Sequence, residues 1–370
     1  NFILKSLYFD DKLKHVITSK VEHSSIIETC KFLEKKKIKV TYLDVNQEGV
    51  IDLNELKSNI NKDTSIVTLM YVNNEIGSIN PMHEVSKICK DSGVLLHVDA
   101  KQAVGKMKID LSKLECDYMS ISSHKIYGPK GVGALYKRNT LQLLTPLIHG
   151  GEQENGERGG TLATHQIVGF GEAAKICYED LENNIKKLEN DERKLIEKLE
   201  FEFNNDIEIV NKFKNKIPGI VSVRFKGINN EVFLKAVSEK ICASTGAACS
   251  NSNPSHVLQA LGYSLDQIRE VVRFSISAYD DLSAFKLYMV DVGLLRRLAL
   301  LAPSAFSEGN RLFVEFKGAL SENYVLQALK NPKIEDIYIK NRDLKYFDIQ
   351  ILSSYSALSY YTDIMNNENI

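Results

Sequence analysis

One lysine lies where an apolar run of the sequence ends. Lys125 follows the alternating segment CDYMSIS and sits inside SSHKIYGPKG, between a serine–histidine pair and a glycine–proline turn. An ammonium group beside a buried strand is costly unless a partner neutralises it or a reaction consumes it. Lys125 is therefore either a surface amine whose stem lies along apolar atoms, or a lysine that forms an imine with an aldehyde cofactor.

Other side chains have the types that an imine-forming cofactor such as pyridoxal phosphate needs. Asp99 ends an apolar run, where a carboxylate is costly unless it meets a cation such as a pyridinium. The alternative is that Asp99 caps a following helix. His23 would stack on the cofactor ring and move protons, or it would only precede a helix. Ser122 and His124 lie close enough to Lys125 in the sequence to bind a phosphate beside it, although they also suit an ordinary loop.

Strand and helix patterns alternate around these residues, which predicts an α/β fold with a mainly parallel sheet and helices on both faces. Ligands bind at the carboxyl ends of such strands, so we expect Asn74, Asp99 and Lys125 to converge on one crevice. Ser25-Ile-Ile-Glu28 has the form of a capping box at a helix start. The predicted strands are KHVITS, KVTYLDV, SIVTLMYV, VLLHVD and DYMSIS, and the predicted helices are residues 24–36, DLNELKSNI and HEVSKICKDSG.

The sequence changes character farther along the chain. Residues 171–203 are highly charged with apolar residues at helical spacing, which predicts a connecting helix. Residues 204–280 mix short strand and helix patterns, and they include a Gly-, Ala- and Ser-rich loop around Cys249. We therefore predict a large domain over 1–170, a connecting helix, a small α+β domain, and an unassigned region over 281–370.

Composition narrows the class of protein. The 370 residues carry a net charge of −1. This gives no excess of basic residues with which to bind nucleic acid or an anionic membrane surface. No apolar run approaches the ~20 residues of a membrane span, and the first residues lack secretory-signal features. Six cysteines without a CxxC pair favour a reducing cytoplasm over disulfides or a zinc site. We assign five of them to packing: Cys30, Cys89, Cys116, Cys177 and Cys242.

Seven motifs in one order carry a more specific resemblance. They are EHSS, YVNNEIG, HVDAKQAVGK, SISSHKIYGPKGVGALY, HGGEQENGERGGT, STGAACS and RFS. Over about residues 1–278 this set resembles the cysteine desulfurases, which are pyridoxal phosphate enzymes of fold type I and class V. The resemblance implies a sheet of the seven-stranded type and a homodimer.

The resemblance also implies which residues bind the cofactor. Lys125 would bond to its aldehyde, Asp99 would pair with its pyridinium, and Gln102 would hydrogen-bond its phenolic oxygen. His23 would stack on its ring, and Asn74 would contact both cofactor and substrate. The phosphate would be held by Ser122, His124 and, across the homodimer, Thr161.

The substrate implied by the resemblance is L-cysteine, and the product is L-alanine. Asn74 and Arg273 would bind the substrate carboxylate, the arginine through its planar fork. Cys249 would take the sulfur as a persulfide for iron–sulfur cluster assembly or thiolation. The alternative is that Cys249 is a small, buried apolar residue with no role in the reaction. A selenocysteine lyase or another class V enzyme remains a second interpretation.

The resemblance is incomplete at both ends. The match begins inside the family's N-terminal segment, so we expect a truncated enzyme that lacks one phosphate-binding loop. An inactive fragment that only binds a sulfur-acceptor or scaffold protein is therefore a third interpretation. Residues 284–330 resemble instead the C-terminal domain of an uncharacterised AAA-type ATPase family, although no Walker A loop is present in the sequence.

Overall fold

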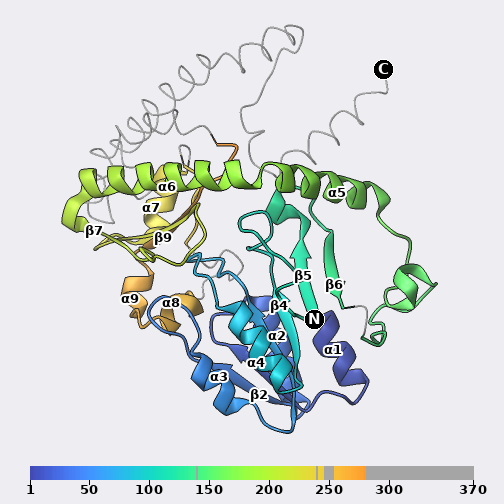
Figure 1. Cartoon of the computed structure of the whole chain (residues 1–370). Helices are drawn as coiled ribbons and strands as arrows, with labels where there is room; N and C mark the ends of the chain where they lie inside the picture. The colour runs from blue at the N-terminus through green and yellow to red at the C-terminus, as the bar shows by residue number, and fades with distance from the viewer. Residues whose placement is uncertain (139–140, 239–240, 246–253, 281–370) are drawn as a thin grey trace, which may run out of the picture. The chain divides into compact units, whose positions relative to one another are not determined.

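The computed structural model describes residues 1–138, 141–238, 241–245 and 254–280 (Figure 1). These residues belong to one compact unit, Asn1–Ala299. Cys249 and the whole of 281–370, with the ATPase-like segment, lie outside the described residues.

A mainly parallel sheet forms the larger part of the described fold. Its strand order is β2-β1-β3-β4-β5-β6, and every neighbouring pair is parallel except the antiparallel pair β5–β6. This confirms the predicted α/β class, with six strands of the sheet described. The strands are β1 (His15–Ser19), β2 (Lys39–Leu43), β3 (Thr64–Met70), β4 (Leu95–Asp99), β5 (Tyr118–Ser122) and β6 (Gly133–Lys137).

Helices cover both faces of this sheet because alternate strand residues point to opposite sides. Val16 and Ile66 belong to a core cluster with Leu4 of α1 and Leu33 of α2, whereas Ile17 and Val67 belong to the cluster that contains residues of α3 and α4. The strands are therefore buried on both faces, as their near-continuous apolar sequences require. The helices are α1 (Phe2–Phe9), α2 (Ser24–Lys35), α3 (Leu53–Asn59) and α4 (Met82–Asp91).

A second, antiparallel sheet follows in the order β7-β8-β9. Leu195, Leu199 and Phe203 of α6 share its core with Phe225 and Phe274. The segment predicted as one connecting helix is two helices that meet at Asp180, and the first starts earlier than expected. The elements are α5 (Thr164–Glu179), α6 (Leu181–Phe203), β7 (Ile207–Ile209), β8 (Ile220–Phe225), α7 (Asn230–Val237), α8 (His256–Ala260), α9 (Leu265–Ile268) and β9 (Val271–Ser275), with short 3-10 helices η1 (Ser123–Ile126), η2 (Gln153–Gly156) and η3 (Asn204–Asp206).

The loop that follows β3 joins the two sheets. Asn211 donates its side-chain amide to the carbonyls of Ile76 and Ile220 at 2.9 and 2.7 Å. Ser222 on β8 donates its hydroxyl to the carbonyl of Glu75 at 2.7 Å. Because these polar groups are buried, each bond removes a desolvation penalty that would otherwise oppose the packing.

Two local predictions were wrong. The helix α2 is capped by His23, whose ring accepts from the backbone N–H of Ser25, so Ser25 lies inside the first turn and makes no capping box with Glu28. Cys242 is exposed, whereas the other four cysteines assigned to packing are buried. Among the described helices, none is long and apolar enough to cross a membrane.

Candidate active site

The carboxyl ends of three strands lie side by side. Asp99 at the end of β4 is opposite Met70 on β3 and Ser120 on β5. The polar residues predicted for a site follow these ends: Asn74 comes four residues after β3, and Lys125 lies in η1 directly after β5. Lys125 is partly buried.

Ser122 and His124 are bonded to each other beside Lys125. The Oγ of Ser122 lies 2.9 Å from Nδ1 of His124. Partial burial lowers the pKa of His124, and the positive charge of Lys125 lowers it further. The imidazole is therefore neutral near pH 7. The bonded pair then keeps one donor for an anion, either the Ser122 hydroxyl or Nε2–H of His124, depending on the tautomer.

Asp99 is a buried carboxylate that holds a cation. Its side chain is 4% exposed, and its Oδ2 lies 3.0 Å from Nζ of Lys101. Its Oδ1 accepts the backbone N–H of Lys101 at 3.1 Å, in a segment that forms turns rather than the helix that a capping role would require. Lys101 was missed because a lysine in a turn usually indicates a solvated surface residue. The signal was a basic residue two positions after a buried carboxylate.

The charges of Lys101, Asp99 and Lys125 all act on His23. Burial lowers its pKa, followed by the charge of Lys101, while Asp99 raises it and Lys125 lowers it. A neutral, half-buried ring suits stacking on a flat apolar surface better than a charged one does. Its Nδ1 bonds to Ser25 of α2, and this bond fixes the ring at the helix start.

Gln102 is oriented by a second lysine that the sequence did not reveal. Nζ of Lys106 donates to Oε1 of Gln102. Burial lowers the pKa of Lys106 to about 8, and the charges of Lys125 and Arg273 act in the same direction. Because the oxygen of Gln102 accepts from Lys106, its amide nitrogen is the end that can donate to a ligand oxygen.

Asn74 and Arg273 come together from the two sheets. Nη1 of Arg273, on β9, donates to the backbone carbonyl of Asn74 at 2.9 Å. The backbone of Arg273 also exchanges two hydrogen bonds with Ser244, of 2.7 and 3.0 Å. Ser244 precedes Cys249 by five residues and belongs to the part of the predicted nucleophile loop, residues 241–245, that the structure describes.

Thr161 is exposed in the segment between η2 and α5. None of the described hydrogen bonds joins it to the residues around Lys125. Its proposed action on the site of a second subunit stays a prediction.

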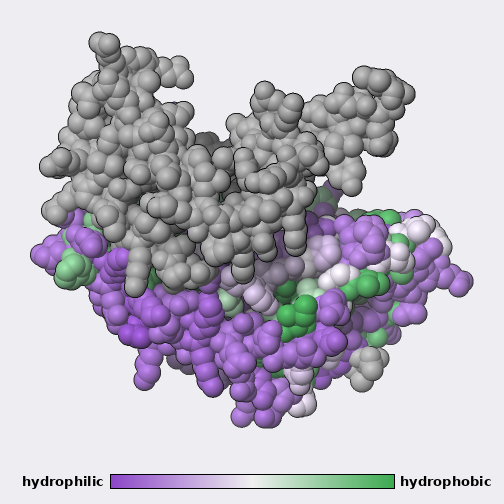
Figure 2. Space-filling model, turned by 90° about the horizontal axis from the view of Figure 1, so that it is seen from above, coloured by the Kyte–Doolittle hydropathy of each residue, from purple (hydrophilic) through white to green (hydrophobic). Residues whose placement is uncertain are grey.

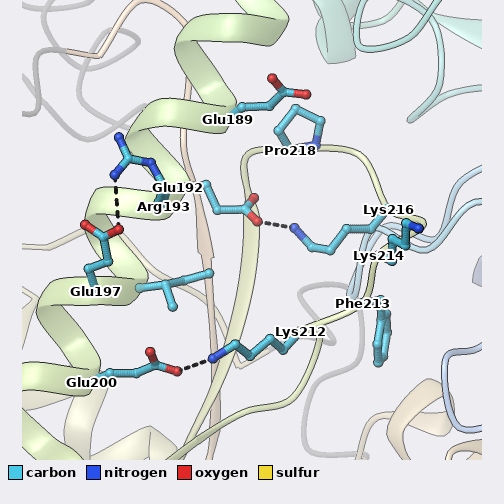
Figure 3. A pocket seen from close by; sticks show the side chains of 11 residues that line it. Glu189, Glu192, Arg193, Glu197, Glu200, Lys212, Phe213, Lys214, Lys216 and Pro218 are labelled. Carbon is cyan, nitrogen blue, oxygen red and sulfur yellow. Dashed lines mark hydrogen bonds and ion pairs between the residues drawn. The ribbon is translucent and has the colours of Figure 1, made fainter.

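A groove elsewhere on the described surface has a volume of about 440 Å³ and lies between α6 and residues 212–218 (Figure 3). Its charges neutralise one another: Lys216 pairs with Glu192 at 2.5 Å, and Lys212 pairs with Glu200 at 2.8 Å. None of the residues singled out from the sequence lines it. The groove is therefore separate from the residues predicted to do chemistry.

Comparison with known proteins identifies the family. Residues 1–284 match the aminotransferase class-V family. The chain is 44% identical over 271 residues to a mitosomal cysteine desulfurase of Trachipleistophora hominis, covering 72% of this chain and 61% of that protein. It is 42% identical over 286 residues to the cysteine desulfurase IscS of Ruthia magnifica subsp. Calyptogena magnifica, covering 75% and 70%. The chain belongs to the class-V aminotransferase family, within its cysteine desulfurases.

Solved structures agree with this assignment. A NifS-like protein superposes with a TM-score of 0.74 at 34% identity, covering 80% of this chain and 79% of that one. A structure described as SspA in complex with cysteine gives a TM-score of 0.64 at 33% identity, covering 76% and 79%. The mainly parallel sheet with its second, antiparallel sheet is thus the fold of these proteins.

The residues around Lys125 fit a cofactor with an aldehyde, a basic ring nitrogen and a phosphate. Lys125 offers the amine, and Asp99 offers a buried carboxylate whose observed partner is already a cation. Ser122 and His124 offer anion donors beside the amine. These donor types fit pyridoxal phosphate.

Proposed function

We propose that this chain is a pyridoxal phosphate-dependent cysteine desulfurase that converts L-cysteine to L-alanine. The observation that carries the proposal is the cation-holding carboxylate of Asp99, next to the strand end that leads to Lys125. The names of the similar proteins support it, since two are cysteine desulfurases and one is a complex with cysteine.

When bound, pyridoxal phosphate supplies an aldehyde that bonds to amines and a protonated ring that withdraws electrons from the attached carbon. Lys125 would hold the aldehyde carbon, and Asp99 would keep the ring nitrogen protonated by stabilising its positive charge. His23 would cover the ring with its neutral imidazole and accept or return a proton. The amide nitrogen of Gln102 would donate to the phenolic oxygen.

The phosphate would be held next to the same strand end. Ser122 and His124, which lie just before Lys125 in the sequence, would provide its side-chain donors. Thr161 would donate from the second subunit of a homodimer. The exposed apolar side chains of α5, including Tyr178 at 83% exposure, support such an association, and Figure 2 shows apolar patches on an otherwise hydrophilic face.

The substrate carboxylate would bind to Arg273. The Asn74 carbonyl holds one arm of this guanidinium at 2.9 Å, which fixes the plane of the fork before substrate arrives. A fixed fork loses less entropy when it binds a carboxylate through two parallel hydrogen bonds.

Cys249 would complete the reaction. Its thiolate would bond to the substrate sulfur as the carbon–sulfur bond breaks, and the bonding electrons would remain on the carbon side. That carbon would take up one proton to become the methyl group of alanine, while Cys249 would keep the sulfur as a persulfide. A sulfur-acceptor protein, in iron–sulfur assembly or thiolation, would then remove it.

The chain would work in a reducing compartment, since four described cysteines are buried thiols and none of the described cysteines forms a disulfide. A cytoplasmic location is our proposal, and the mitosomal relative marks an organelle as its alternative.

The test is release of alanine from L-cysteine by the full chain supplied with pyridoxal phosphate. We expect alanine from the unmodified chain and none from Lys125→Ala. Selenocysteine in a parallel assay distinguishes a selenocysteine lyase, which would prefer it strongly. Failure of the unmodified chain to release alanine from either substrate would favour the inactive-fragment interpretation and overturn the proposal.

A further inference from the structure

A buried ion pair lies at the end of β4. The Lys101 side chain is 25% exposed, and its ammonium lies 3.0 Å from the carboxylate of Asp99, whose side chain is 4% exposed. The other oxygen of Asp99 accepts the backbone N–H of Lys101. Both carboxylate oxygens are thus bonded to one residue two positions farther along the chain.

Asp99, and not the neighbouring Glu22, carries the negative charge beside Lys101. Glu22 is fully buried, and burial raises its pKa to about 8. Its charge interacts with both Asp99 and Lys101. Because Glu22 is protonated near pH 7, the positive charge of Lys101 is balanced by Asp99.

The next step rests on the proposed function. There the Asp99 carboxylate is also the partner of the protonated ring nitrogen of the cofactor. One buried carboxylate cannot compensate two cations fully, because each desolvated charge needs its own partner. Lys101 has another partner within reach, since its Nζ lies 3.3 Å from Oγ of Ser25, and its long stem can carry the ammonium to water.

We propose that Lys101 is a built-in competitor of the cofactor ring for Asp99. Its ammonium occupies the carboxylate until the ring nitrogen displaces it, and this exchange lowers the affinity of the site for the cofactor. Lys101 is a positioning residue in this account, since it acts through Asp99.

The test uses pyridoxamine phosphate, which has the ring and phosphate of the cofactor but no aldehyde to react with Lys125. Its dissociation constant is measured by calorimetry on the full chain and on Lys101→Gln, Asp99→Asn and the double variant. We expect Lys101→Gln to bind it about tenfold more tightly, which corresponds to about 1.4 kcal/mol. In the Asp99→Asn background the same lysine change should have no effect on affinity.

A matched control separates competition from a general loss of an ion pair. Lys137 pairs with Glu157 at 2.8 Å, with side chains 19% and 14% exposed, and it lies opposite Tyr118 at the other end of β5. Lys137→Gln therefore removes a similar pair without touching Asp99. The rise in Tm caused by pyridoxamine phosphate should be larger in Lys101→Gln than in the unmodified chain, and unchanged in Lys137→Gln.

The experiment distinguishes failure of the competition proposal from failure of the proposed function. Tighter binding by Lys101→Gln that disappears with Asp99→Asn supports the competition. Equal or weaker binding by Lys101→Gln overturns it, while binding by the unmodified chain still supports a cofactor site. Absence of binding in every variant overturns both proposals.

Discussion

The buried carboxyl group of Glu22 gives a prediction that does not depend on any ligand. Glu22 is 0% exposed, and its Oε1 accepts from the Ser19 hydroxyl at 2.8 Å and from the backbone N–H of Met70 at 2.9 Å. Its Oε2 has no hydrogen-bond partner within the described part of the chain. Burial is the largest cause of its raised pKa, about 8 against a usual 4.5.

The sign of the pH dependence follows from proton binding. Between pH 4.5 and 8 the folded chain keeps a proton on Glu22 that the unfolded chain has lost. The stabilisation from this group is therefore complete below the unfolded pKa and is lost as the pH rises toward the folded pKa. The free energy of unfolding should fall by about 1.4 kcal/mol for each pH unit in this range, before the contributions of other groups are added.

The substitution Glu22→Gln tests this, because glutamine has nearly the same shape as glutamate but has no ionisable group. The new amide group brings unpaired N–H donors into the core and lowers stability by about 1–3 kcal/mol, but this cost does not vary with pH. From pH 6 to pH 8 the stability difference between the unmodified chain and Glu22→Gln should shift by about 2–3 kcal/mol in favour of the variant.

Urea unfolding at pH 6, 7 and 8 measures this difference. Glu28→Gln is the control, because Glu28 lies on the exposed face of α2 with 66% of its side chain accessible. Its difference from the unmodified chain should stay constant over the same range. If the curve for Glu22→Gln runs parallel to that of the unmodified chain, Glu22 is ionised in the folded chain, and the assignment of Asp99 as the cluster's anion loses its support.

Three further predictions test the site and its frame. Arg273→Lys should raise the KM for L-cysteine by about tenfold or more in steady-state assays, because a lysine cannot form the two-bonded fork, and an unchanged KM would contradict the role. Cys249→Ser should keep cofactor binding and lose alanine release, whereas Cys242→Ser, which removes the exposed thiol, should keep both. Asn211→Ala should lower the unfolding free energy by about 3 kcal/mol in urea titrations, because it strands the carbonyls of Ile76 and Ile220; a change below about 1 kcal/mol would refute this.

Periodicity alone predicted five of the six strands of the larger sheet but not the antiparallel β6. The β-branched runs between amphipathic segments predicted five parallel strands, and all five are present because both of their faces must be covered by helices. The positions of Asp99 and Lys125 at strand ends followed from the same pattern. The neighbourhood of Asn74 and Arg273 did not, since 199 residues separate them and only their resemblance to a family paired them.

Charged residues in turns were the hardest to interpret. Lys101 and Lys106 occur in a turn segment where lysines are usually solvated, yet both are directed at polar groups of the candidate site. Their partners are only two and four residues away, but the partial burial of this segment depends on how it packs beyond β4, which local sequence does not encode. The capping-box prediction at Ser25 failed because His23, two residues earlier, itself supplies the cap.

The central claim is that sulfur passes from L-cysteine to Cys249. The most direct measurement is mass spectrometry of the cysteine-containing peptides after one turnover of the full chain loaded with pyridoxal phosphate. We predict one added sulfur atom on the Cys249 peptide, alanine in equal amount, and neither product with Lys125→Ala. Added sulfur on a different cysteine, or alanine without any persulfide, would contradict the account.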